Sequence, residues 1–222
     1  MPSPSASGAR RVAGLYAITP EETDSAVLAG KVEAALRGGA ALVQYRNKSS
    51  DKILRREQAA ALLALCQAAG APLIINDDLE LALAIGADGV HLGRGDGELR
   101  AARQALGPAR LLGASCYDRI DLARDALAAG ADHIAFGSVY ASSTKPGAVR
   151  APLELLTRAR AELAAPVVAI GGIDARNAPP VIAAGAAALA VLSALFDAPD
   201  ISAAATRFAS LFTSPTFPPP PL

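Results

Sequence analysis

Cysteine is scarce in this sequence, and so is any excess of charge. The two cysteines, Cys66 and Cys116, do not have metal-ligand spacing, and each lies in an apolar run. Buried thiols in a reducing cytoplasm are therefore expected rather than a disulfide. Lys and Arg together number 21, as do Asp and Glu. This balance gives no electrostatic reason to expect nucleic acid or an anionic membrane as a partner.

Long apolar segments are also absent. No apolar run reaches about 18 residues without a charged residue or a turn signal, so no transmembrane helix is expected. The first residues, "MPSPSASGARR", lack the apolar centre of a secretory signal. We expect residues 1–12 to form a loose leader and 13–212 the folded domain. The proline-rich tail, 213–222, is expected to be disordered because proline cannot continue a helix.

Apolar runs alternate with helix-like segments along the chain. Four resemble one another, because in each a Gly-Ala pair precedes a short β-rich run: "RGGAALVQ", "AIGADGVHLG", "AAGADHIAFG" and "AAGAAALAVLS". Glycine there suits a left-handed helix end. Four other runs lie between them: "GLYAIT", "APLIIND", "ARLLGAS" and "APVVAIGG". Between runs the period is helical, for example in Ile53 to Ala69 and Leu122 to Ala129.

Strands that are apolar on both faces and alternate with helices predict a parallel sheet covered by helices. Eight such units in 222 residues favour closure into a single α/β (β/α)8 TIM barrel. An open, doubly wound sheet remains the alternative from the pattern alone. In a barrel of this kind the active site lies at the carboxyl ends of the strands.

The second run ends in three polar side chains at alternate positions, Gln44, Arg46 and Lys48. Alternation along a strand would point all three to one side. Two cations and an amide in one place predict a bound anion, such as a diphosphate. The alternative is a solvated strand exit whose cations pair with acids elsewhere.

Carboxylates follow the next two runs. Asn76 and Asp77 end the third run, and His91 and then Asp96 follow the fourth. Neighbouring strands lie about 4.8 Å apart, so Asp77 and Asp96 could share one hard cation. One or two carboxylates together with substrate phosphates are typical of Mg²⁺ sites. Asp78 is expected to cap a helix, and Asp96 could alternatively be a turn residue.

Later strand ends carry weaker signals. Ser115 ends the fifth run, Gly171-Gly172 the seventh and Leu192-Ser193 the eighth. Loops after strands seven and eight often bind phosphate in this fold, which suggests a second phosphorylated substrate. The loop "SSTKPG" contains Lys145, one of four lysines in the chain, and is either functional or a solvent loop. His91 and His133 are expected to be packed, hydrogen-bonded histidines.

Taken together, the motifs resemble the thiamine phosphate synthase family. They are "LYAIT", "VQYRNK", "LIINDD", "ADGVHLG" with Asp96, "GAS", "STKPG", "AIGGI" and "VLSAL", in the family's order. The resemblance spans Leu15 to about Phe196. It implies a cytoplasmic TIM-barrel transferase that joins a pyrimidine methyl diphosphate to a thiazole phosphate, uses Mg²⁺ and releases pyrophosphate.

The resemblance also implies roles for single residues. Those expected on the pyrimidine diphosphate are Gln44, Arg46, Lys48, Asn76, Ser115 and Lys145, of which Arg46, Lys48, Ser115 and Lys145 would serve catalysis. Asp77 and Asp96 would hold Mg²⁺. The thiazole phosphate would contact Ser142, Ser143, Thr144, Gly172, Leu192 and Ser193. The chain departs from the family at Arg94, where glutamine is common, and at Ser138 and Ser142, which replace common proline and threonine positions.

The family's reaction is held to be dissociative, so the cations would stabilise charge growing on the departing pyrophosphate. Two alternatives remain. One is a thiazole tautomerase on the same fold, and the other is a non-catalytic phosphate-binding barrel. Retention of both the cations and the aspartates argues against each. The partners expected are small phosphorylated substrates, while a homo-oligomer and a carboxylated thiazole are left open.

Overall fold

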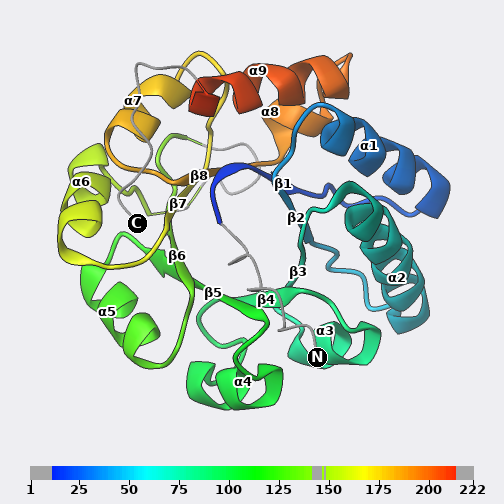
Figure 1. The fold of residues 1–222 in the computed structure, drawn as a ribbon, viewed down its shortest axis with the longest axis horizontal. Helices are drawn as coiled ribbons and strands as arrows, with labels where there is room; N and C mark the ends of the chain where they lie inside the picture. The colour runs from blue at the N-terminus through cyan, green and yellow to red at the C-terminus, as the bar shows by residue number, and fades with distance from the viewer. Residues whose placement is uncertain (1–11, 142–146, 148, 214–222) are drawn as a thin grey trace, which may run out of the picture.

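The strands close into a parallel barrel, with helices around its outside (Figure 1). This computed structural model describes residues 12–141, 147 and 149–213. The strand order is β1 to β8, and β8 pairs with β1 to complete the ring. The predicted TIM barrel is therefore confirmed, and the open-sheet alternative is wrong.

The elements follow the apolar runs of the sequence closely. The strands are β1 (Gly14–Ile18), β2 (Leu42–Tyr45), β3 (Leu73–Asn76), β4 (Gly89–Leu92), β5 (Leu111–Tyr117), β6 (His133–Gly137), β7 (Val167–Ile170) and β8 (Ala188–Val191). The helices are α1 (Ser25–Arg37), α2 (Lys52–Ala69), α3 (Leu79–Ile85), α4 (Leu99–Leu106), α5 (Ile120–Ala128), α6 (Leu153–Glu162), α7 (Ala178–Ala183), α8 (Ser193–Phe196) and α9 (Ile201–Thr213).

The Gly-Ala pairs end helices as the sequence predicts. Their glycines are Gly39, Gly86, Gly130 and Gly185, with φ of 96°, 71°, 97° and 110°. This left-handed backbone costs glycine little, because it has no Cβ to clash. Each turn sends the chain from the helix directly into the next strand, so the helix-strand repeat depends on these positions.

Two apolar cores explain why the strands are hydrophobic on both faces. The larger core lies between the outer face of the barrel and the helices, and it contains the buried thiol of Cys66. A smaller core fills the barrel itself, with Tyr16, Leu42, Ile74 and Val168 among its members. The inner side chains close the barrel, so a ligand can enter only at an end.

Several details at the ends of the elements differ from the sequence prediction. β2 ends at Tyr45, so Arg46 and Lys48 lie in the loop that follows rather than on the strand. β8 ends at Val191, so Leu192 and Ser193, expected to end the eighth run, lie beyond the strand, and Ser193 begins α8. Val12, assigned to the leader, is buried at 3% exposure, and Thr213, assigned to the tail, is the last residue of α9. Residues 1–11 and 214–222 lie outside the described residues, so the predicted disorder there remains a prediction.

The expectations for Asp78 and for the two cysteines are confirmed. Asp78 caps α3, because its side chain accepts a hydrogen bond from the Leu81 amide. Cys66 and Cys116 are free and buried, and burial raises the pKa of each thiol to about 12. Within the part of the chain that the structure describes, no helix is long and apolar enough to cross a membrane.

Candidate active site

One pocket, with a volume of about 760 Å³, opens at the carboxyl ends of the strands. Its size suits small-molecule substrates. The predicted site residues that line it are Gln44, Arg46, Lys48, Asn76, Asp77, Asp96, Ser115, Gly172, Leu192 and Ser193. The prediction that strand ends far apart in sequence open onto one mouth is therefore confirmed. Ser142, Ser143, Thr144 and Lys145 lie outside the described residues.

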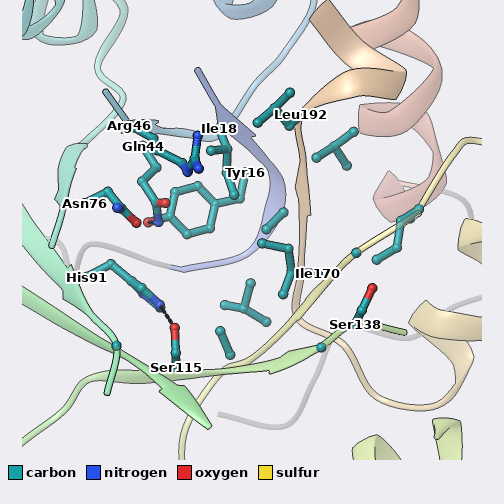
Figure 2. A pocket seen from close by; sticks show the side chains of 18 of the residues that line it. Tyr16, Ile18, Gln44, Arg46, Asn76, His91, Ser115, Ser138, Ile170 and Leu192 are labelled. Atoms are coloured by element: carbon teal, nitrogen blue, oxygen red, sulfur yellow. Dashed lines mark hydrogen bonds between the residues drawn. The ribbon is translucent and has the colours of Figure 1, made fainter. Parts of the chain in front are cut away.

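The floor of the pocket holds a buried amide. Gln44 is 4% exposed, and its Nε2 donates to the Tyr16 hydroxyl at 3.0 Å. Both side chains project into the barrel (Figure 2). Burial raises the pKa of Tyr16 well above its ordinary value, so the phenol stays protonated. In this arrangement the Gln44 amide nitrogen is the donor to the phenol, so its oxygen does not contact Tyr16. Tyr16 was not identified from the sequence.

Both interpretations of Arg46, as a ligand-facing cation and as a cation paired with an acid, apply in the structure. Its guanidinium forms an ion pair with Glu21, at 3.0 Å, and its side chain is only 16% exposed. It also lines the pocket. The Thr19 hydroxyl contacts its backbone on both sides, accepting from the Arg46 amide at 2.9 Å and donating to the Arg46 carbonyl at 3.2 Å. Arg46 is thus paired with an acid elsewhere and still faces a ligand space.

Two carboxyls meet on the neighbouring side of the pocket. Burial and contact with Asp96, which is hydrogen-bonded to it, raise the pKa of Asp77, while Asn76 and Lys48 oppose this rise. Asp77 also has a φ of 63°, an unusual backbone conformation for a residue with a side chain. Asp96 accepts a hydrogen bond from the Gly93 amide at 2.8 Å. It is a turn residue as well as a pocket carboxylate.

The contact between Asp77 and Asp96 fits a hard cation. Two like charges in contact destabilise each other, and a divalent ion between them would reverse that effect. Among the described residues, no group of three or more His, Cys, Asp or Glu is placed to hold a metal ion. Two carboxylates alone match Mg²⁺, which commonly completes its octahedron with water and substrate phosphate.

Two histidines lie deeper in the barrel, on β4 and β6, the two strands that flank Gly113 of β5. The pairing register aligns His91 with Gly113 and Gly113 with His133. A Cβ on Gly113 would lie 2.3 Å from His133 Nε2 and 2.4 Å from His91 Nδ1, so only glycine leaves room for both rings. His91 Nε2 lies 3.0 Å from Ser115 Oγ (Figure 2).

The expectation that both histidines are packed is confirmed. The expected hydrogen bonding is found for His91, through Ser115, but not for His133 among the described residues. Among the residues that the structure describes, no hydrogen-bond partner contacts either nitrogen of His133 or Nδ1 of His91. Burial lowers the pKa of His91 to about 4 and that of His133 to about 3. Both rings are therefore neutral near pH 7, and the pocket floor adds no positive charge.

Two of the residues at which the chain departs from the family pattern, Arg94 and Ser138, also line the pocket. The Arg94 guanidinium carbon lies 5.4 Å from the centre of the Tyr117 ring, a cation–π distance. The Arg94 amide donates to the Tyr117 hydroxyl at 3.1 Å. Arg94 thus adds a third described cation to the pocket wall, while Ser138 lines the pocket on the side of β6.

The wall formed by β7 and β8 has a different character. Gly171 and Gly172 have positive φ, of 103° and 62°. A Cβ on Gly172 would lie 2.2 Å from the Ala141 carbonyl oxygen, so the backbone there is both left-handed and crowded. Ile170 and Leu192 add apolar surface beside it (Figure 2). One pocket thus has a charged side at β2–β4 and an apolar, glycine-rich side at β7–β8.

Comparison with known proteins agrees with this arrangement. A family model described as thiamine monophosphate synthase matches residues 15–195. The chain belongs to this family. The curated thiamine-phosphate synthase of Thiobacillus denitrificans is 59% identical over 90% of this chain and 95% of its own. That of Aromatoleum aromaticum is 58% identical over 91% of this chain and 97% of its own.

A solved structure supports the family assignment. The thiamine phosphate pyrophosphorylase of Pyrococcus furiosus superposes with a TM-score of 0.82 and 33% identity. The match covers 91% of this chain and 96% of that one. The resemblance read from the sequence motifs is thereby confirmed for the family and the fold. The roles of the individual residues remain predictions.

The contact between the two carboxyls generates a test that needs no substrate. We expect Asp77→Asn to raise the Tm of the metal-free protein at pH 7.5, because the raised pKa shows that the Asp77 carboxylate is disfavoured in the fold. Asparagine tolerates a left-handed backbone well. Mg²⁺ should raise the Tm of the wild type and shift the variant much less.

Asp174→Asn is the matched control, because Asp174 lines the same pocket but contact with Arg176 lowers its pKa. Thermal unfolding with chelator and with MgCl2 gives both quantities. The interpretation fails if Asp77→Asn lowers the metal-free Tm as Asp174→Asn does, or if Mg²⁺ shifts wild type and Asp77→Asn equally.

The buried histidine pair predicts acid sensitivity. The pKa of His133 falls from 6.5 in the unfolded chain to about 3, so below pH 6.5 the unfolded chain binds a proton that the fold does not. Stability should therefore fall as the pH drops, by about 2 kcal/mol from His133 between pH 6.5 and 5. His133→Leu, measured by denaturant unfolding, should remove that part of the slope. An unchanged slope in this variant would show that His133 does not cause it.

Proposed function

We propose that this barrel condenses a pyrimidine methyl diphosphate with a thiazole ethyl phosphate, giving thiamine phosphate and pyrophosphate. Its curated relatives carry the name of this transferase. The observation that supports the proposal most is the two-sided pocket, in which cations and paired carboxyls face a glycine-rich, apolar wall. Two phosphorylated substrates of different polarity suit such a division.

The charged side is assigned to the diphosphate. Arg46 and Lys48 come from the loop after β2, and Arg94 from the loop after β4. Together with the Asn76 amide they offer donors from neighbouring loops to one anion. Gln44, with its amide nitrogen held by Tyr16, presents its oxygen for an exocyclic amine of the pyrimidine. Lys145, expected on the same diphosphate, lies outside the described residues.

Asp77 and Asp96 are the residues that would hold Mg²⁺. Bound there, the ion would supply charge neutralisation to the diphosphate oxygens as they leave. Arg46 and Lys48 would provide the same stabilisation from the protein, and the Arg46 guanidinium is held by Glu21 before the charge develops. An interaction of this kind is stronger in the transition state than in the ground state, so it raises the rate.

The apolar side is assigned to the thiazole phosphate. Gly172 allows a phosphate to approach the backbone closely, while Leu192 and Ile170 offer apolar contact to a ring. Ser193 adds a hydroxyl at the start of α8. Ser142, Ser143 and Thr144, expected to complete this subsite, lie outside the described residues.

The pocket floor suits a reaction in which the diphosphate leaves first. The pyrimidine cation that remains would be captured by the thiazole nitrogen, so no protein nucleophile is needed. Neutral His91 and His133 put no positive charge beneath that cation. Ser115, held by His91, would contact the pyrimidine. A neutral floor of this kind is compatible with the dissociative path that the family resemblance implies.

The alternatives are less well supported. A tautomerase need not bind a diphosphate, and a phosphate-binding scaffold need not hold a metal. The chain keeps the cations of the β2 exit and both pocket carboxyls together in one site. A cytoplasmic location, a homo-oligomer and the carboxylation state of the thiazole remain predictions.

Two variants separate the two sides of the pocket. Arg46→Ala should raise the KM for the pyrimidine diphosphate and lower kcat, by about ten- to a hundredfold in kcat/KM, because it removes a charge-assisted contact that strengthens as charge develops. Ser193→Ala should raise chiefly the KM for the thiazole phosphate. Gly172→Val is less suitable, because the φ of 62° and the nearby Ala141 carbonyl would strain the loop itself.

The measurement is a pair of KM values and one kcat for each variant, with the other substrate saturating and thiamine phosphate detected. Matching circular dichroism is the control for folding. The assignment is wrong if Arg46→Ala affects only the thiazole phosphate, or if it leaves both substrates and the rate unchanged.

A further inference from the structure

One buried amide outside the pocket, that of Gln58, contacts two loops. One is the loop after β2, which contains Arg46, and the other is the β1–α1 loop, which contains its ion-pair partner Glu21. Gln58 lies in the middle of α2 and is 1% exposed. It does not line the pocket. Its Oε1 accepts from the Tyr45 hydroxyl at 2.9 Å and from Asn47 Nδ2 at 3.0 Å. Its Nε2 donates to the Glu22 carbonyl at 2.8 Å.

These three bonds admit only one orientation of the Gln58 amide. The Asn47 amide N–H requires its oxygen and the Glu22 carbonyl requires its nitrogen, so a flipped amide would lose both of these bonds, whereas the Tyr45 hydroxyl could serve either orientation. Asn47 is fixed as well, because its Oδ1 accepts from the Ser49 amide at 2.8 Å. The network is therefore rigid in its geometry, and it leaves none of these buried polar groups without a partner.

The segments joined by Gln58 carry the two halves of one ion pair. Tyr45 and Asn47 are the sequence neighbours of Arg46. Both contact Gln58 of α2, while Arg46 lines the pocket. Glu22 follows Glu21, whose carboxylate binds the Arg46 guanidinium at 3.0 Å. One amide thus fixes the residues beside the arginine and the loop that bears its carboxylate partner.

The backbone of Arg46 is held separately, by the two hydrogen bonds of Thr19. Thr19 leaves the long side chain free to swing, whereas Glu21 limits where its end can lie. The position of Glu21 depends on the β1–α1 loop, whose Glu22 carbonyl is held by Gln58. A residue needed only to fill the core could be apolar there, and three directed bonds are more than filling requires.

We propose that Gln58 is a positioning residue for the diphosphate side of the pocket, which sets the place of the Arg46 guanidinium without contacting substrate. The inference rests on the proposed assignment of Arg46 to the diphosphate. A guanidinium displaced by about 1 Å would bind the leaving group less well and stabilise its developing charge less.

The test uses Gln58→Met, which keeps an unbranched side chain of similar length but removes all three hydrogen bonds. We expect the Kd for inorganic pyrophosphate with excess Mg²⁺, measured by calorimetry, to rise about tenfold. kcat should fall by a similar factor, while the KM for the thiazole phosphate stays within about twofold. Tyr45→Phe, which removes a single hydroxyl, should change the same quantities in the same direction by less.

Asp88→Ala is the matched structural control. Asp88 is also buried, and it accepts from the Leu73 amide at the opposite end of the barrel. This variant should lower the Tm at least as much as Gln58→Met does, yet leave pyrophosphate binding and both KM values unchanged. The comparison separates positioning from general loosening of the barrel.

Arg46→Ala in the same binding assay separates the two claims. If Arg46→Ala weakens pyrophosphate binding and Gln58→Met and Tyr45→Phe do not, the positioning role of Gln58 is wrong while the assignment of Arg46 stands. If Arg46→Ala leaves pyrophosphate binding unchanged, the assignment itself is wrong. Equal losses for both substrates in Gln58→Met would show general loosening and would also overturn the positioning role.

Discussion

The contact between the Asp77 and Asp96 carboxyls is the constraint on which the rest of the pocket depends. A folded protein gains nothing from two like charges in contact, here a half-buried Asp77 and an exposed Asp96, and the raised pKa of Asp77 is the consequence. The cost is explained if a cation and an anion complete the site. Lys48 already opposes the repulsion, and Arg46 and Arg94 extend positive charge along the same wall. A divalent metal at the carboxylates and a diphosphate at the cations would each neutralise charge on the part of the wall that binds it.

The barrel positions these charged side chains through contacts between neighbouring strands and loops. Parallel strands bring Asn76 and Asp77 beside the end of β4, and a hydrogen bond from the Gly93 amide turns Asp96 inward. Further out, Thr19 and Gln58 hold the loop after β2 from two sides. The pocket therefore depends on short contacts between neighbouring βα loops. Fixed charges of this kind stabilise a leaving group without reorganising during the reaction.

The charged side of the pocket could be predicted from the sequence, because β2, β3 and β4 are each followed by charged residues, which are rare in a buried strand. What could not be predicted depends on contacts across the barrel. Tyr16 reads as a core residue, and nothing local shows that its hydroxyl meets Gln44. His133 was expected to be hydrogen-bonded, but the space left by Gly113 brings it against another ring. Gln58 reads as an ordinary polar position in α2, since its partners are 11, 13 and 36 residues away.

The most direct test of the account is the position of a metal ion in crystals grown with Mn²⁺ and inorganic pyrophosphate. Mn²⁺ prefers the same oxygen ligands as Mg²⁺ and is located by its anomalous scattering. The account predicts one anomalous peak between the carboxylates of Asp77 and Asp96, with pyrophosphate bridging from that ion to the Arg46 guanidinium. A peak away from both carboxylates, or pyrophosphate bound away from Arg46, would contradict it.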